Sequence, residues 1–148
     1  MTFISIDHIS GKDMRFLNMA IEQIERSGFL ASRRMGAALI GNRIYSSHNE
    51  YRSIVDSRVV AGSLHAEMKV ILMSRIDKTI NKNRRQTTNK NKKNNNAKCI
   101  YVARIADGHF GCAMPCDECM RWLRIYGIKA VKYTDHIDGR DVLCSIKI

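Results

Sequence analysis

Two short stretches of the sequence place metal-binding side chains where helices are expected to begin. The stretch "HAE" puts His65 and Glu67 at the head of an apolar helical pattern, and "PCDEC" puts Cys116 and Cys119 in a C-x-x-C spacing after a proline. One neutral imidazole nitrogen and two thiolates form a borderline-soft donor set that suits tetrahedral Zn²⁺. Helix starts that follow strands gather along one edge of an α/β sheet, so these side chains are expected to converge.

Glu67 indicates what such a site would do. Three protein ligands leave a fourth position open, and water held there loses a proton far more readily than bulk water. Glu67 lies on the same helical turn as His65, so its carboxylate can receive that proton without binding the metal. The alternative is a closed structural zinc site with a fourth ligand from Cys112, His109 or another lone cysteine or histidine. Glu67 favours the open arrangement, because a closed site has no use for it.

Three helices are expected to carry or support these residues. The segment 13–27 has apolar residues at spacings of three and four, with Ser10 as a capping residue and Gly28 as a left-handed stop. A second, largely buried helix is predicted over 65–76, after an irregular stretch. A third begins at Pro115, whose missing N–H would have no partner in a first turn, and ends near Gly127.

Five strands are expected to form one mixed sheet covered by these helices. Two short strands within 34–49 flank Gly41-Asn42, which predicts a two-residue hairpin turn. The apolar segment 99–106 is typical of an interior strand and is followed by the turn Asp107-Gly108. The strands at 128–134 and 141–148 are too close in sequence for a crossover helix. They are therefore expected to pair as an antiparallel hairpin.

The composition limits the class of protein. With 148 residues, 45% apolar and 26% charged, the chain is expected to fold as a single domain, 1–148, and not as a disordered or membrane protein. It has no run of about 18 apolar residues. The first residues, "MTFISIDHISGKDMRF", are interrupted by polar positions before a secretory signal could form. Five irregularly spaced cysteines favour thiols or metal ligands over disulfides, so an intracellular, cytoplasmic location is expected.

Most of the net charge of +11 lies in one segment. Residues 77–98 hold eight lysines or arginines and one aspartate, a net +7, which leaves +4 for the rest of the chain. The part "NKNRRQTTNKNKKNNN" has no apolar side chain to bury, which predicts a mobile, low-complexity surface loop inserted at about 77–98. A solvated insertion is the simpler interpretation. The alternative is a tether for RNA or another phosphate-bearing partner.

The two motifs together resemble the zinc signature of the cytidine deaminase-like superfamily, H-x-E followed by P-C-x-x-C. "RRMGAALI", "IYSSHN" and "GIKAVKY" are similar to that family's first strand, its second strand and the strand after the zinc helix. The resemblance implies a three-layer α/β/α fold and a hydrolytic deaminase acting on a base amino group. It also implies a homo-oligomer.

Carried onto this sequence, the resemblance assigns roles to individual residues. The zinc ligands would be His65, Cys116 and Cys119. Glu67 would move the protons, the backbone N–H of Ala66 would meet the base carbonyl, and Asn49 would contact the base or sugar. Phe110 and Met114 precede the zinc helix where a base would enter, so either could stack on the ring or simply fill space.

Two departures from the family pattern bear on the substrate. Residues 49–65 lack the Gly/Pro-rich stretch of many deoxycytidylate deaminases, and residues 107–114 lack the tryptophan-serine lead-in of polynucleotide cytidine deaminases. We expect a zinc-dependent deaminase of a free cytosine nucleoside or nucleotide, without a membrane partner. One alternative is an RNA-editing deaminase of the transfer-RNA adenosine type, holding RNA through the basic segment. Another is a non-catalytic, zinc-containing relative that binds nucleic acid.

Overall fold

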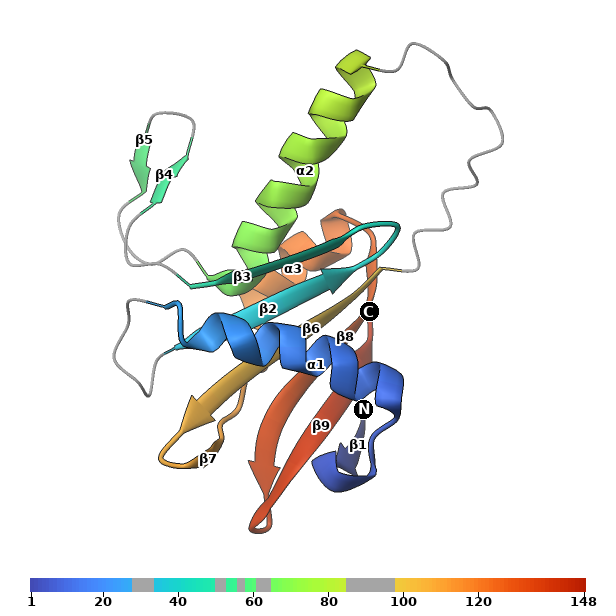
Figure 1. Ribbon diagram of the computed structural model, residues 1–148, viewed down its shortest axis with the longest axis vertical. Coiled ribbons are helices and arrows are strands. Elements are labelled where there is room, and N and C mark those ends of the chain that lie inside the picture. Colours follow the sequence, from blue (N-terminus) through green and yellow to red (C-terminus); the bar gives the residue numbers. More distant parts are fainter. Residues whose placement is uncertain (28–33, 50–52, 56–57, 61–64, 85–97) are drawn as a thin grey trace.

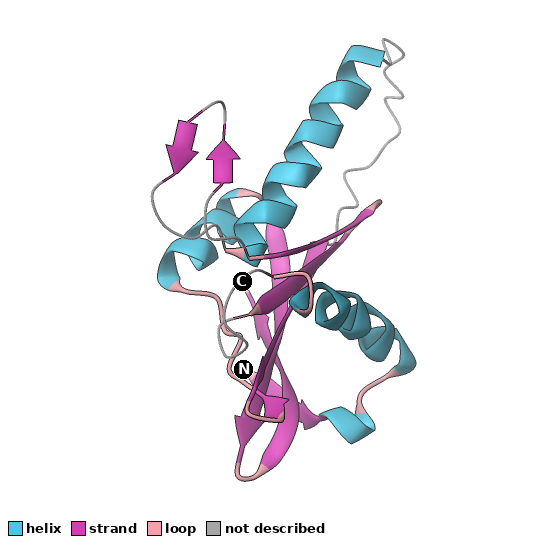
Figure 2. Cartoon of the chain, turned by 60° about the vertical axis from the view of Figure 1, so that its left-hand side comes forward, coloured by secondary structure: helices cyan, strands magenta, loops and turns pink. Residues whose placement is uncertain are grey.

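A mixed β-sheet separates one helix on one face from two on the other, as the computed structural model in Figure 1 shows. The structure describes residues 1–27, 34–49, 53–55, 58–60, 65–84 and 98–148. The turned view in Figure 2 places α1 (Gly11–Ile24) on one side of the sheet and both α2 (Ala66–Arg84) and α3 (Asp117–Ile125) on the other. The expected three-layer α/β/α architecture is confirmed.

The sheet has seven strands, in the order β1-β9-β8-β6-β2-β3, and β7 pairs with β6. Its members are β1 (Thr2–Ser5), β2 (Met35–Ile40), β3 (Ile44–His48), β6 (Lys98–Ala106), β7 (His109–Phe110), β8 (Ile128–Ile137) and β9 (Arg140–Lys147). Among the strands that the structure describes, only β6 and β8 pair in parallel, and they are the neighbours joined through α3. The mixed sheet is confirmed, but the expected number of five strands was wrong by two.

Alternation along the central strands builds a separate core on each face. Ala38 of β2 and Tyr101 of β6 pack against α1, whereas their neighbours Ala37 and Val102 pack on the side of α2 and α3. Successive side chains of a strand point to opposite faces, so one strand serves both layers. Four consecutive residues of each central strand, 36–39 of β2 and 100–103 of β6, are therefore buried, and the apolar sequence "CIYVARIA" predicts an interior strand for β6.

Three features hold α1 in place: a helix cap, a close approach of α1 to β2, and an ion pair with β8. Ser10 Oγ accepts a hydrogen bond from Asp13 N at 3.1 Å, which confirms the predicted cap. A Cβ at Gly36 of β2 would overlap the carbonyl oxygen of Ala20, so only glycine allows α1 to lie this close. The carboxylate of Asp13 also accepts hydrogen bonds from Tyr101 Oη and, at 2.7 Å, from Lys132 Nζ.

The second helix is longer than the sequence predicts. α2 continues to Arg84, eight residues beyond the predicted end at 76, so the first part of the basic segment is helical. Lysine, arginine and isoleucine are adequate helix formers, and the preceding turns supply the costly nucleus. Lys98, at the other end of the segment, already belongs to β6. The remainder of the expected loop, 85–97, lies outside the described residues, as does Gly28.

The turns agree with the sequence at two places and differ at a third. Asp138 and Gly139, with φ of 50° and 75°, join β8 to β9 as the predicted antiparallel hairpin. Asp107 and Gly108 form a similar turn between β6 and β7. Between β2 and β3, however, Ile40 pairs with Ile44, so the loop has three residues, 41–43, and the predicted two-residue turn was wrong.

The remaining strands are short pieces without a strong sequence signal. β1 extends the sheet by pairing antiparallel with β9. β4 (Ser53–Val55) and β5 (Arg58–Val60) form a separate antiparallel hairpin where an irregular stretch was expected. A 3₁₀ turn, η1 (Ile6–His8), links β1 to α1. Among the described residues, no helix combines the length and the apolar character needed to cross a membrane.

Candidate metal centre and active site

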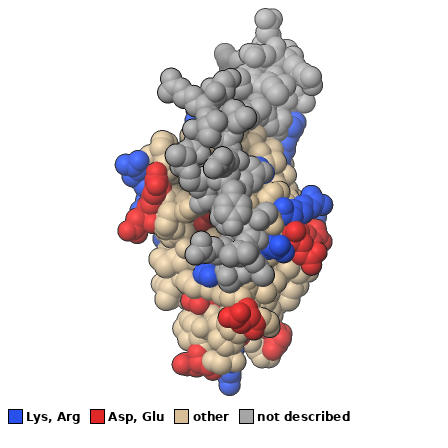
Figure 3. Space-filling model, turned by 90° about the vertical axis from the view of Figure 1, so that its left-hand side faces the viewer, with Lys and Arg blue, Asp and Glu red and all other residues tan. Residues whose placement is uncertain are grey.

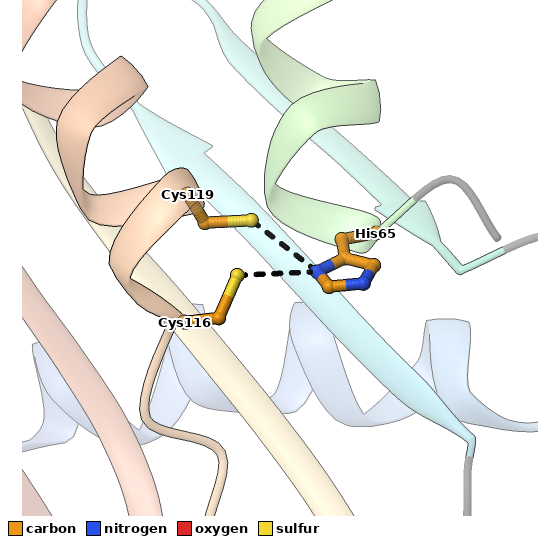
Figure 4. A group of neighbouring side chains, drawn as sticks. All are labelled: His65, Cys116 and Cys119. Atoms are coloured by element: carbon orange, nitrogen blue, oxygen red, sulfur yellow. Dashed lines mark hydrogen bonds between the residues drawn. The ribbon is translucent and has the colours of Figure 1, made fainter. Parts of the chain in front are cut away.

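His65, Cys116 and Cys119 meet where α2 and α3 begin. His65 directly precedes α2, Cys116 is the N-cap of α3, and Cys119 lies in the first turn of that helix. Figure 4 shows both cysteine side chains directed at the imidazole of His65. Pro115 stands before the cap and not inside the first turn, so α3 begins two residues later than predicted.

The three ligand atoms have the spacing of a metal site. His65 Nδ1 lies 3.3 Å from Cys119 Sγ and 3.7 Å from Cys116 Sγ. Ligands at ordinary Zn–N and Zn–S bond lengths in a tetrahedron are about 3.6 Å apart. All three atoms lie within 4.8 Å of one another, and among the described residues no other histidine, cysteine or carboxylate joins this group. The residues therefore fit a zinc site with three protein ligands.

The site is closed on one side and open on the other. Cys119 is 2% exposed, because the first turn of α3 packs against the sheet, whereas His65 and Cys116 are exposed. Burial, and after it the nearby Glu67 carboxylate, raises the pKa of the Cys119 thiol. A cation bound here would oppose both effects and favour the thiolate. The exposed His65 and Cys116 side chains are accessible to solvent.

Glu67 is buried beside this group with one carboxylate oxygen unpaired. Its side chain is 1% exposed, and Oε2 has no hydrogen-bond partner within the described part of the chain. Burial raises the pKa of Glu67, against a smaller opposing effect of His65. An unpaired buried polar atom costs on the order of 1–3 kcal/mol. Such a cost is typical of a group whose partner arrives with a ligand, and a raised pKa suits proton transfer.

Asn49 is held rigidly at the end of β3. Its side chain is buried, and Oδ1 accepts hydrogen bonds from Ser27 Oγ at 2.7 Å and from Met35 N at 2.9 Å. Because Oδ1 receives both donors, the amide is oriented and Nδ2 lies on its other side. Sequence reasoning missed Ser27, which stands 22 residues earlier, three residues after the end of α1, and has no local feature that marks it.

Residues 109–116, which we call the strap, lead from β7 to α3 and are held along β8 by Thr134. The buried Thr134 Oγ1 donates a hydrogen bond to Gly111 O at 3.1 Å, and Thr134 O accepts one from Ala113 N at 2.9 Å. These bonds set the course of the chain that ends at Cys116. Thr134 carries no local signal in the sequence, because its partners are more than 20 residues away.

The other predicted substrate-binding residues occupy different environments. Ala66 is fully buried at the first position of α2. Met114 is 50% exposed on the strap, two residues before Cys116. Phe110 lies at the other end of the strap, where its backbone N–H donates to Asp141 Oδ1 at 3.2 Å. Met114 is thus close in sequence to the metal group, and Phe110 lies beside β9.

Comparisons with known proteins bear on the family and the fold. The family model for the cytidine and deoxycytidylate deaminase zinc-binding region matches residues 10–135, which include every candidate site residue. The structure is similar to a crystal structure of cytidine deaminase from Burkholderia pseudomallei, with a TM-score of 0.55 and 15% sequence identity. The similarity covers 94% of this chain and 93% of that one, and at this identity it shows the fold alone. No curated protein sequence matches the chain.

Proposed function

The chain belongs to the family that carries the cytidine and deoxycytidylate deaminase zinc-binding region, and from this membership we propose that it deaminates a free cytosine nucleoside or nucleotide. The products are the corresponding uracil compound and ammonia. The observation that supports this best is the combination of three metal-ligand atoms with the buried, unpaired carboxylate oxygen of Glu67. A purely structural metal site has no need of that carboxylate.

The residues that would hold Zn²⁺ are His65, Cys116 and Cys119. Their spacing and their mixed nitrogen and sulfur donors support this assignment. When bound, Zn²⁺ supplies a Lewis acid that makes water acidic near neutral pH. The first turn of α3 contributes as well, because the positive end of a helix favours thiolates at Cys116 and Cys119.

Glu67 carries the protons of the reaction. It takes a proton from the attacking water and gives it to the ring nitrogen beside the amino-bearing carbon of the base. It then delivers the second proton of the water to the amino group, so the C–N bond breaks, ammonia leaves and a carbonyl remains. The raised pKa of Glu67 supports this role, because a group that both accepts and donates protons works best with a pKa near the ambient pH.

Ala66 and Asn49 position the base. Ala66 is the first residue of α2, so its N–H has no acceptor within the helix and can donate to a carbonyl of the base. Its small side chain leaves space there. The amide of Asn49, oriented by Ser27, presents Nδ2 to the base or sugar. Phe110 and Met114 are proposed to contact the base from the strap.

A screen for ammonia release tests the substrate class. The zinc-loaded protein would be incubated with cytidine, deoxycytidine, CMP, dCMP, adenosine, guanine and short RNAs. We expect turnover with at least one free cytosine nucleoside or nucleotide. Turnover confined to RNA would replace this proposal with the RNA-editing alternative, and no turnover with zinc bound would favour the non-catalytic one.

The basic segment does not favour a nucleic-acid substrate on its own. On the face seen in Figure 3, the visible basic side chains of the described residues lie beside acidic ones and form no continuous basic patch. Deleting residues 85–97, which follow the end of α2, separates the two enzyme classes. A mononucleotide enzyme keeps its turnover, whereas an RNA enzyme loses salt-dependent binding and activity.

We also propose that copies of the chain associate. Phe3 and Ile4 of the edge strand β1 are 55% and 52% exposed, which is a large apolar exposure for one short strand. Light scattering of the purified protein measures the mass in solution. A mass equal to one chain of 16.9 kDa at all concentrations would contradict association.

A further inference from the structure

A second group of metal-ligating side chains lies outside the site described above. His109 of β7, His136 of β8 and Asp141 of β9 each offer a ligand atom, and these atoms lie within 4.8 Å of one another. The group occupies the lower end of the sheet in Figure 1, where β7 and the β8–β9 turn lie. None of its members belongs to the His65 group, so His109 is not the fourth ligand that a closed structural zinc site would need.

Strand pairing holds this group in place. His136 and Asp141 face each other directly in the β8–β9 register, with His136 Nδ1 at 2.8 Å from Asp141 Oδ1. Asp141 Oδ1 also accepts a hydrogen bond from Phe110 N at 3.2 Å. The rings of His109 and His136 are stacked, with their centroids 4.2 Å apart. Strands β7, β8 and β9 therefore bring the backbones of the three residues together.

The remaining donor atoms have the chemistry of a cation site. His109 Nδ1 lies 2.8 Å from the carbonyl oxygen of Phe110, to which it can only donate, so Nε2 keeps its lone pair. Asp141 Oδ2 has no hydrogen bond to the described residues. His136 and Asp141 are about one-third exposed, at 32% and 36% of their side chains, so a hydrated ion can reach them.

We propose that His109, His136 and Asp141 form a second cation site, which binds Zn²⁺ independently of the deaminase centre. Two imidazole nitrogens and one carboxylate oxygen favour a borderline divalent metal over Mg²⁺ or Ca²⁺, which take oxygen ligands. Stacked rings do not aim their lone pairs at one point, so ligation requires His109 to turn about its side-chain bonds and to give up its hydrogen bond to Phe110 O. His109 is exposed on a strand of two residues, which permits that rotation.

The second cation site lies at the start of the strap, which leads to Cys116 of the first site. His109 begins the strap that ends at Cys116, and the hydrogen bonds of Thr134 fix the middle of the strap at Gly111 and Ala113. A cation shared by His109, His136 and Asp141 fixes the first residue of the strap to β8 and β9 as well. Occupancy of the second site therefore stabilises the segment that carries Phe110 and Met114.

Metal analysis after equilibrium dialysis tests the proposal on the full chain, with Zn²⁺ alone as the ligand. We expect two equivalents of Zn²⁺ per chain. The first, at the His65 site, resists brief chelation, and the second, at the His109 site, is released readily. His109→Ala and His136→Ala should each weaken the second equivalent by about tenfold or more and leave the first unchanged. His8→Ala, which removes an exposed histidine of η1, is the matched control and should keep both equivalents.

Hydrogen exchange supplies a second measurement. Saturating the second equivalent should slow amide exchange in residues 109–114 of the wild type and of His8→Ala, and should leave His109→Ala unchanged. Because His109 is exposed, its alanine variant carries the test even if a change at His136 disturbs folding. A single zinc equivalent in the wild type, or a second equivalent that binds His109→Ala as tightly, would overturn the proposal. Neither measurement depends on turnover, so the result is separate from the proposed deaminase activity.

Discussion

The two faces of the sheet each hold a shielded carboxylate, and the two carboxylates have opposite surroundings. Asp13 of α1 is paired with Tyr101 and Lys132, and although burial alone would raise its pKa, these partners lower it. Glu67 of α2 has an unpaired oxygen, and burial raises its pKa. A satisfied carboxylate stabilises the fold, whereas an unsatisfied one costs stability and is available for chemistry. We therefore infer that the α1 face is structural and that the α2–α3 face carries the proposed reaction.

On the α2–α3 face, removing a zinc ligand should have the largest effect on ammonia release. Cys119→Ser replaces a thiolate by a poor zinc ligand at the most buried of the three positions. We expect the variant to retain less than one zinc equivalent and to lose all detectable ammonia release. Metal analysis and the ammonia assay measure this on the same sample. Full turnover without zinc would contradict the inference that the α2–α3 face carries the proposed reaction.

On the α1 face, Gly36→Ala should have the largest effect on stability. The new Cβ would overlap the backbone oxygen of Ala20, which cannot rotate away, so α1 must move off β2. We expect a loss of about 3 kcal/mol in the free energy of unfolding, measured by urea denaturation. The matched change Gly11→Ala adds a Cβ that meets no atom within 4 Å and should cost far less. Equal stability of the two variants would contradict the close approach.

Asp13→Asn should weaken the fold without changing the chemistry. The variant loses the charged bonds to Tyr101 and Lys132, which costs about 1–3 kcal/mol. Ammonia release per folded molecule should stay unchanged. Asp7→Asn, at an exposed position of η1, is the control and should have little effect on stability.

The pH dependence of stability should distinguish the same two carboxylates. The folded pKa of Asp13 lies below its usual value of 3.8, so its contribution is fully present above that pH and is lost as the pH falls below it. Asp13→Asn should therefore flatten the acid limb of the stability curve. The folded pKa of Glu67 lies above its usual value of 4.5, so in the metal-free protein Glu67 removes stability as the pH rises above 4.5.

Ser27→Ala should have the smallest effect of these variants. It tests whether a residue that follows α1 can influence the proposed reaction, because Ser27 contacts the predicted substrate-binding residue Asn49. Loss of its bond to Asn49 Oδ1 removes about 1 kcal/mol, which corresponds to a roughly fivefold lower kcat/KM. We expect the change mainly in KM, with partial rescue in Ser27→Thr. Steady-state kinetics on the substrate identified by the screen measures both. A loss of stability with unchanged kinetics would make Ser27 purely structural.

Local patterns predicted the parts of this molecule that depend on short-range chemistry. Ser10 as a cap, the turn at Asp138-Gly139 and the ligand trio all depend on residue type and spacing. The group of His65, Cys116 and Cys119 could be predicted although the two cysteines follow His65 by 51 and 54 positions, because helix starts gather at one sheet edge.

Long-range partners were not predictable in the same way. Ser27 with Asn49, and Thr134 with Gly111, are bonds between ordinary polar residues more than 20 positions apart. Strand β1 is four residues long, too short for a periodic signal, and it forms because the outer edge of β9 offers backbone partners. The end of α2 was misplaced because a polar, basic composition indicated a loop, while the helix continues over the same residues.

The catalytic role of Glu67 is tested most directly by comparing ammonia release and zinc content of the wild type and Glu67→Gln. Gln keeps the size of the side chain but cannot exchange protons, and it removes the cost of a buried, unpaired charge. We expect one tightly bound zinc equivalent in both proteins, equal or higher thermal stability in the variant, and turnover that is lower in the variant by about 10²–10⁴-fold or more. Wild-type turnover in Glu67→Gln with zinc in place would contradict the role of this carboxylate and with it the proposed mechanism.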